Sequence, residues 1–170
     1  VGFKGRIKGF NYEIYGRQRL YEQKNRYFES LNQKIKPEIF FGGALRYFFP
    51  DSTNFLNADA EFSINSFYLN GIISFKGLEG QFFQSIRPAG LFFRNFDNGI
   101  VNWNLDFGAV SNTYIKADYK LHFGQFRVEP GISNTLYANY LYLDHNAKPA
   151  QSTSAFTVLQ VRSLFGYKSK

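Results

Sequence analysis

The stretch Lys34–Phe49, with the sequence KIKPEIFFGGALRYFF, decides the fold class of this chain. From Ile35 onward it places apolar residues at almost every second position, whereas Lys34, Glu38 and Arg46 fall between them. Alternation with a period of two indicates a β-strand with one apolar and one polar face. It runs well beyond the usual strand of about five or six residues, and membrane-spanning strands need about nine or more. The stretch is therefore typical of a strand that crosses a membrane, and Pro50–Asn54 reads as the turn after it.

The composition requires apolar and charged side chains to be separated in space. The chain has 170 residues, of which 21 are Phe, 12 are Tyr and 19% are charged, and its mean hydropathy is −0.32. No run approaches the roughly 20 apolar residues of a membrane helix, so alternating strands remain as the spanning element. The absence of Cys excludes disulfides and thiolate chemistry.

The same alternation predicts further strands at Ile100–Val110, Thr113–Gly124, Arg127–Tyr142 and Phe156–Tyr167, with a turn at Ser111-Asn112. Three regions are less regular. Val1–Tyr15 changes phase near Gly9-Phe10, as at a bulge; Phe55–Phe75 is either a hairpin at Asn65-Ser66 or one bulged strand; and Phe82–Phe96 is interrupted by Pro88. We expect a single all-β domain over residues 1–170, a closed antiparallel up-and-down transmembrane β-barrel of about eight strands, within a range of about eight to ten.

Alternation alone does not say which face of the barrel points outward. Aromatic residues near predicted strand ends, such as Tyr47 and Phe165, suit girdles at the two membrane interfaces. The polar face mixes charges of both signs, as an interior needs if buried charges are to be paired. We therefore expect an outward apolar face and an interior charge network. Its members are Glu38, Arg46, Asp59, Glu61, Asp106, Lys116, Asp118, Lys120, His122, Arg127, Glu129 and Arg162.

Two segments of this sequence resemble strand ends of small Gram-negative outer-membrane β-barrels of the opacity-protein class. They are Gly42–Phe49 with the turn after it, and the last strand, which closes on Phe165 and Tyr167. The resemblance implies a location in the cell outer membrane. In one respect the sequence departs from that class, because Lys168–Lys170 follows the final aromatic residue.

Two polar segments, Gly16–Gln33 and Asp144–Ser154, are expected as loops on the extracellular side. Arg17, Arg19, Lys24 and Arg26 in the first could bind the phosphates of lipopolysaccharide. In the second, Asp144, His145 and Ser152 supply acid, base and nucleophile types for an enzyme acting on lipid A. The sequence has no His-x-Ser-Asn element, so a solvated loop is favoured there. Neither a metal site nor a cofactor is expected.

The function favoured by the sequence is that of a non-enzymatic barrel with a packed, charged interior. It would act through its surface loops or outer wall as a structural or interaction component. Its partners would be outer-membrane lipid, including lipopolysaccharide, and a protein in a larger membrane complex. Nucleic acid is not expected, because the aromatic residues share a face with aliphatic ones instead of with Lys and Arg. The alternatives are a lipid A acyl hydrolase or acyltransferase, a subunit of a larger outer-membrane complex, and a soluble lipocalin-like carrier.

Overall fold

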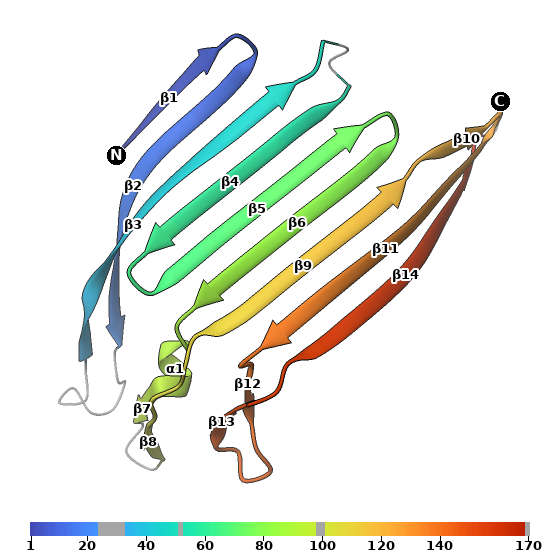
Figure 1. Cartoon of the computed structure of the whole chain (residues 1–170). Helices are drawn as coiled ribbons and strands as arrows, with labels where there is room; N and C mark the ends of the chain where they lie inside the picture. Colours follow the sequence, from blue (N-terminus) through green and yellow to red (C-terminus); the bar gives the residue numbers. More distant parts are fainter. Residues whose placement is uncertain (24–32, 51–52, 98–100, 169–170) are drawn as a thin grey trace.

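The computed structural model of the chain describes residues 1–23, 33–50, 53–97 and 101–168. Its main feature is one antiparallel sheet that the chain builds as a meander (Figure 1). The strands of this sheet are β1 (Gly2–Ile7), β2 (Phe10–Gln23), β3 (Gln33–Phe48), β4 (Phe55–Ser63), β5 (Ser66–Phe75), β6 (Leu78–Arg87), β9 (Val110–Tyr119), β10 (Leu121–Phe123), β11 (Phe126–Ala138) and β14 (Phe156–Tyr167). The expected antiparallel all-β architecture is confirmed.

The ten strands occupy nine positions across the sheet, because β9 and β10 pair with successive parts of β11 on the side opposite to β14. The order begins at β1 and ends at β14, and no pairing joins these two edges among the described residues. The described sheet is therefore open, where the sequence predicted a closed barrel. With an odd number of positions in an antiparallel meander, β1 and β14 run in the same direction (Figure 1).

The described elements outside the main sheet all lie at one end of its strands. At the opposite end, called the short-turn end, Lys8-Gly9 and Lys76-Gly77 link adjacent strands with positive φ at both residues. Such two-residue turns match the twist of the flanking strands. At the other end, called the long-connection end, lie the helix α1 (Leu91–Arg94), the hairpin of β7 (Asn95–Asp97) and β8 (Asn102–Asn104), and the hairpin of β12 (Leu141–Leu143) and β13 (Pro149–Gln151) (Figure 1).

Several predicted boundaries are wrong. The phase change at Gly9-Phe10 is the β1–β2 turn and not a bulge. Of the two alternatives for Phe55–Phe75, the hairpin is confirmed, with its turn at Ile64-Asn65. The segment predicted as a loop from Gly16 belongs to β2 as far as Gln23. Ser111-Asn112 lies inside β9, where it pairs with both neighbouring strands.

The predicted strand Ile100–Val110 forms no continuous strand in the described part. Its residues Asn102–Asn104 pair locally with β7, and the Trp103 ring stacks on Phe96 at 4.7 Å between centroids. Pro88 directly follows β6, where a residue without a backbone N–H ends the ladder. The chain then leaves the sheet until Val110.

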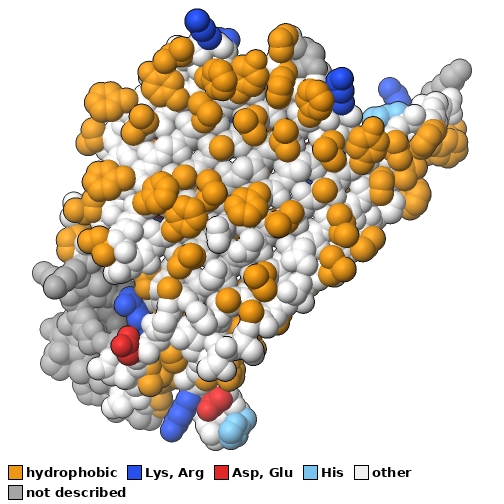
Figure 2. Space-filling view, viewed as in Figure 1, with side chains coloured by type: hydrophobic (Ala, Val, Ile, Leu, Met, Phe, Trp, Pro, Cys, Tyr) orange, Lys and Arg blue, Asp and Glu red, His pale blue; other side chains and the backbone are white. Residues whose placement is uncertain are grey.

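The register sorts the side chains of the sheet onto two faces, because directly paired residues share a face and neighbours alternate. All charged and His side chains that the structure describes within the ten strands fall on one face, the polar face. They are Lys4, Arg6, Glu13, Arg17, Arg19, Glu38, Arg46, Asp59, Glu61, Glu79, Arg87, Lys116, Asp118, His122, Arg127, Glu129 and Arg162. The opposite, apolar face is covered with hydrophobic side chains, and charged side chains appear at the ends of the strands (Figure 2).

Burial on this single layer is the reverse of that in a soluble protein. Glu61 and Asp118, both on the polar face, are buried at 5% and 8% exposure, whereas Ile115 and Val161 on the apolar face are 53% and 77% exposed. Side chains therefore crowd together on the polar face and stand apart on the apolar face. In the described part of the chain, no helix is long and apolar enough to cross a membrane.

Candidate functional site on the polar face

Glu61 is the centre of the first polar cluster, near the long-connection end. Its carboxylate forms an ion pair with Arg17, accepts a hydrogen bond from Tyr15 Oη at 3.2 Å, and lies 3.7 Å from Arg19 Nη2. The Arg19 and Arg17 guanidinium groups lie 4.4 and 5.4 Å from the centre of the Phe40 ring. Phe40 is 3% exposed, so a buried aromatic face supports the two cations.

A glycine makes this cluster possible, because β3 separates Tyr15 on β2 from Glu61 on β4. Gly42 is the β3 residue paired with both. A Cβ atom on Gly42 would lie 2.6 Å from Oη of Tyr15 and 2.8 Å from the carbonyl oxygen of Ala60. The Tyr15 ring therefore lies over β3 through a gap that only glycine leaves.

Asp118 is the centre of the second cluster, nearer the short-turn end. It accepts hydrogen bonds from Arg162 Nη2 at 2.7 and 2.6 Å, and Lys116 Nζ lies 2.6 Å from its Oδ2. Arg162 is on β14, which is separated from the β9 strand of Asp118 by β11. Gly131 of β11 is paired with both residues, and a Cβ there would overlap with Asp118 Oδ1. A second glycine thus lets a side chain cross a strand to its partner.

Further polar contacts extend these clusters across the sheet. Lys120 Nζ lies 3.0 Å from Glu79, which is also 3.6 Å from Lys116. Between the two clusters, Asn70 donates to Asp59 at 2.9 Å and Gln81 donates to Asn70 at 3.2 Å, which links β4, β5 and β6. Side chains joined by hydrogen bonds or ion pairs therefore occur across the polar face from β2 to β14.

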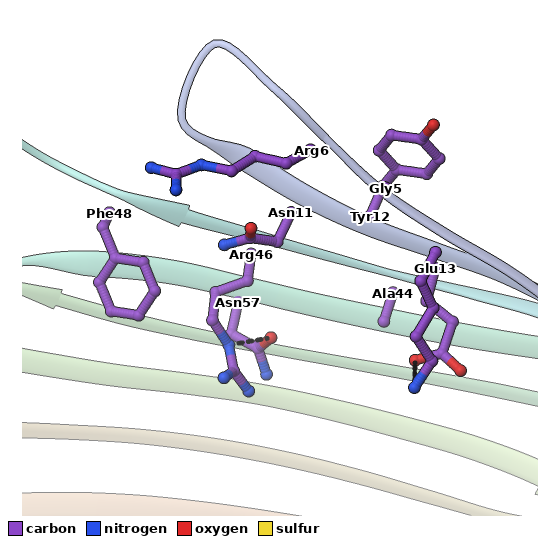
Figure 3. Close-up of a pocket in the computed structure, with 10 residues that line it drawn as sticks. Gly5, Arg6, Asn11, Tyr12, Glu13, Ala44, Arg46, Phe48 and Asn57 are labelled. Atoms are coloured by element: carbon purple, nitrogen blue, oxygen red, sulfur yellow. Dashed lines mark hydrogen bonds and ion pairs between the residues drawn. The ribbon is translucent and has the colours of Figure 1, made fainter.

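A third group lies at the short-turn end and contains two arginines. Arg6, Asn11, Arg46 and Asn57 are paired in sequence across β1, β2, β3 and β4, so they form one lateral row, the Arg–Asn row. The row lines a hollow of about 570 Å³ (Figure 3). Among the described residues, the one hydrogen bond between side chains of the row is long, 3.5 Å from Arg46 Nε to Asn57 Oδ1.

The structure places the residues of the predicted charge network as follows. The two clusters contain Glu61, Lys116, Asp118, Lys120 and Arg162. Arg127 forms an ion pair with Glu129 and is paired with His122 in the register, whereas Asp59 accepts a hydrogen bond from Asn70. Arg46 belongs to the Arg–Asn row, and Glu38 lies beside Arg19 in a hollow of about 240 Å³. Asp106 lies outside the sheet, in the connection before β9. Sequence reasoning missed Tyr15, Asn70, Glu79 and Gln81.

The predicted headgroup-binding residues are divided by the structure. Arg17 and Arg19 lie on β2 and contact Glu61 on the polar face. Lys24 and Arg26 fall outside the described residues. Binding of lipopolysaccharide by this set stays a prediction.

Asp144, His145 and Ser152 lie at the β12–β13 hairpin, where each bonds its own neighbours. Asp144 Oδ1 accepts the backbone N–H groups of Lys148 and Asn146 at 2.8 and 2.9 Å, and these bonds lower the pKa of the Asp144 carboxyl. The His145 ring lies 3.0 Å from the Asn146 side chain, and Ser152 Oγ donates to the Ser154 carbonyl at 2.7 Å. The hydrogen bonds of the three residues thus stabilise turns and form no acid–base–nucleophile relay among the described contacts.

Comparison with known families matches residues 2–168 to a family described as "Putative porin". No curated protein and no solved structure matches the chain. The family match supports an outer-membrane β-barrel protein of porin type and does not single out the opacity-protein class.

Proposed function

The chain belongs to this porin family, and on that premise we propose that its sheet forms part of the wall of a pore through the Gram-negative outer membrane. The polar face would line an aqueous passage for small polar solutes, and the apolar face would contact lipid. One observation carries the proposal: the described charged side chains of the ten strands lie on one face. A charge at the centre of a bilayer costs about 2.5–3.5 kcal/mol on insertion scales, so this segregation suits a wall between water and lipid.

The apolar face supports the lipid side of the proposal. Large side chains such as Phe3 and Phe165 are 74% and 79% exposed, and a continuous surface of this kind marks a membrane or binding surface. Aromatic contacts at its short-turn end include Phe10–Tyr47 and Phe126–Tyr167, with ring centroids 4.5 and 5.1 Å apart. They suit an aromatic girdle at a membrane interface. A soluble carrier would need the opposite burial.

The wall would close around the passage through the free edges of β1 and β14. Unpaired backbone groups are not tolerated against lipid, so both edges need partner strands. Because β1 and β14 run in the same direction, an all-antiparallel barrel needs an odd number of strands between them. The closed barrel would then be wider than the eight strands whose interior side chains fill completely.

A barrel that conducts nothing and acts on lipid or a protein partner through its loops or outer wall is the second candidate. The observation that favours it is that carboxylates such as Glu61 and Asp118 are already bonded, as in a packed interior. Ion conductance separates the two functions. The protein refolded in detergent and added to a planar lipid bilayer is expected to give stepwise conductance, whereas a boiled sample is not. Folded protein that shows heat-modifiable migration but no conductance would refute the pore and favour the interaction role.

A further inference from the structure

The Arg–Asn row at the short-turn end differs from the other charged groups of the polar face in having no carboxylate among its members. Arg6, Asn11, Arg46 and Asn57 are directly paired across four adjacent strands, so their side chains share one face. In Figure 3 the Arg6 and Arg46 side chains flank Asn11, and Arg46 lies beside Asn57. The row thus places two guanidinium and two amide side chains on adjacent strands of one face.

The nearest acids are already engaged with other groups. Glu13, which borders the same hollow, forms an ion pair with Lys4 at 3.1 Å. Asp59 accepts from Asn70 at 2.9 Å. Within the described part of the chain, Arg6 makes no side-chain hydrogen bond or ion pair, and Arg46 has the 3.5 Å contact to Asn57. Two positive charges therefore face the hollow without a neutralising partner there.

The hollow has room for a solute. Its volume of about 570 Å³ corresponds to on the order of twenty water molecules. Small residues keep it open, since Ala44 lies between the rows of Arg46 and Gly42 on β3, and the Phe48 ring forms part of the lining. Guanidinium groups bind carboxylate and phosphate through paired, charge-assisted hydrogen bonds, and Asn amides add further donors.

We infer that the Arg–Asn row binds small solutes that carry a carboxylate or phosphate group. The site would hold such anions at the short-turn end of the proposed passage, and the inference rests on the proposed function for their access to it. Phosphate groups of membrane lipids are not the ligand, because the row lies on the face opposite to the apolar side chains. Arg6 and Arg46 would contact the anion, and Asn11 and Asn57 would orient it.

Isothermal titration with inorganic phosphate tests the site directly, using the protein refolded in a non-ionic detergent at constant ionic strength. Arg46→Gln is expected to weaken phosphate binding about tenfold, equal to about 1.4 kcal/mol. Arg6→Gln should give a similar loss, and heat-modifiable migration verifies that each variant is folded. The matched control is Lys8→Asn in the adjacent β1–β2 turn, which also removes one positive charge and suits the φ of 44° there. It should change the affinity by less than about twofold.

Three results would overturn the inference: no phosphate binding by the native chain, unchanged binding in a folded Arg46→Gln or Arg6→Gln variant, or an equal loss in Lys8→Asn. The last would mean that net charge alone attracts the anion. Conductance is measured separately. A protein that conducts but binds no phosphate contradicts this inference alone, whereas a folded protein that binds phosphate without conducting contradicts the pore and leaves the site supported.

Discussion

Replacing Gly42 by alanine tests whether the glycine gap in β3 positions the Glu61 cluster. The new methyl group would lie 2.6 Å from Tyr15 Oη and 2.8 Å from the backbone oxygen of Ala60. The backbone oxygen cannot rotate away, so either the strands separate or the Tyr15 ring leaves Glu61. Overpacking costs about 1–3 kcal/mol, and a lost hydrogen bond to a charged group costs about 1.5–3 kcal/mol. If both costs apply in full, we expect Gly42→Ala to lower the free energy of unfolding by roughly 2.5–6 kcal/mol.

The assay is urea unfolding of the detergent-refolded protein, followed by far-ultraviolet circular dichroism. Gly71→Ala on β5 is the matched control, because no heavy atom beyond Gly71 and its two chain neighbours lies within 4 Å of the Cβ it would add. That change should be neutral or stabilising by about 0.5–1 kcal/mol, since glycine weakens a strand interior. Tyr15→Phe removes the hydrogen bond to Glu61 without adding a methyl group and should cost less than Gly42→Ala. Equal unfolding midpoints for the two alanine variants would refute the steric argument.

Three further expectations concern the orientation of the sheet and its connections. In proteoliposomes, a membrane-impermeant charged thiol reagent should label Asn57→Cys rapidly and the adjacent Ala58→Cys slowly; equal labelling contradicts opposite faces. The folded hairpin lowers the pKa of the Asp144 carboxyl. Asp144 therefore contributes its full stabilisation of the hairpin above the ordinary Asp pKa of about 3.9, and this stabilisation is lost as the pH falls through the lower pKa of the folded state. An NMR titration of the Lys148 amide should therefore have its midpoint below 3.9, and a midpoint at or above it disagrees. The Gln151 side chain forms hydrogen bonds with Gly108 N, Gly108 O and Asn139 O at 2.9 Å each. Gln151→Ala should therefore speed proteolysis of the connection before β9. Unchanged cleavage would show that these hydrogen bonds do not hold the connection in place.

The sequence allowed the long alternating strands to be predicted well. Lys34–Phe49 differs from β3 by one residue at each end, and Phe156–Tyr167 coincides with β14. In both, apolar side chains repeat over a length that no other regular element explains. The predicted mixture of charges on one face also follows from local alternation, because it requires only the parity of neighbouring residues.

The failures arose where alternation carries less information. The charged residues of Gly16–Gln33 led to the prediction of a loop there, although β2 includes Arg17 and Arg19 and continues to Gln23. Turn residues were missed at Gly9, because a Lys-Gly pair is a weaker turn signal than Asn-Gly. Contacts between strands two positions apart, such as Tyr15 to Glu61 across Gly42, depend on the register of three strands. No local pattern encodes that register.

The segregation of the two faces also protects the register of the sheet during assembly. If β14 slipped by one residue along β11, Arg162 would leave Asp118 and point toward hydrocarbon, while Phe165 would turn toward the charged side. The same slip in β9 would move both Lys116 and Asp118 from the polar face to the apolar face. In water such a misaligned sheet would be only somewhat less stable, but in a bilayer each misplaced ion adds its own insertion penalty. With the apolar face against lipid, as proposed, the bilayer would therefore destabilise sheets with shifted strands.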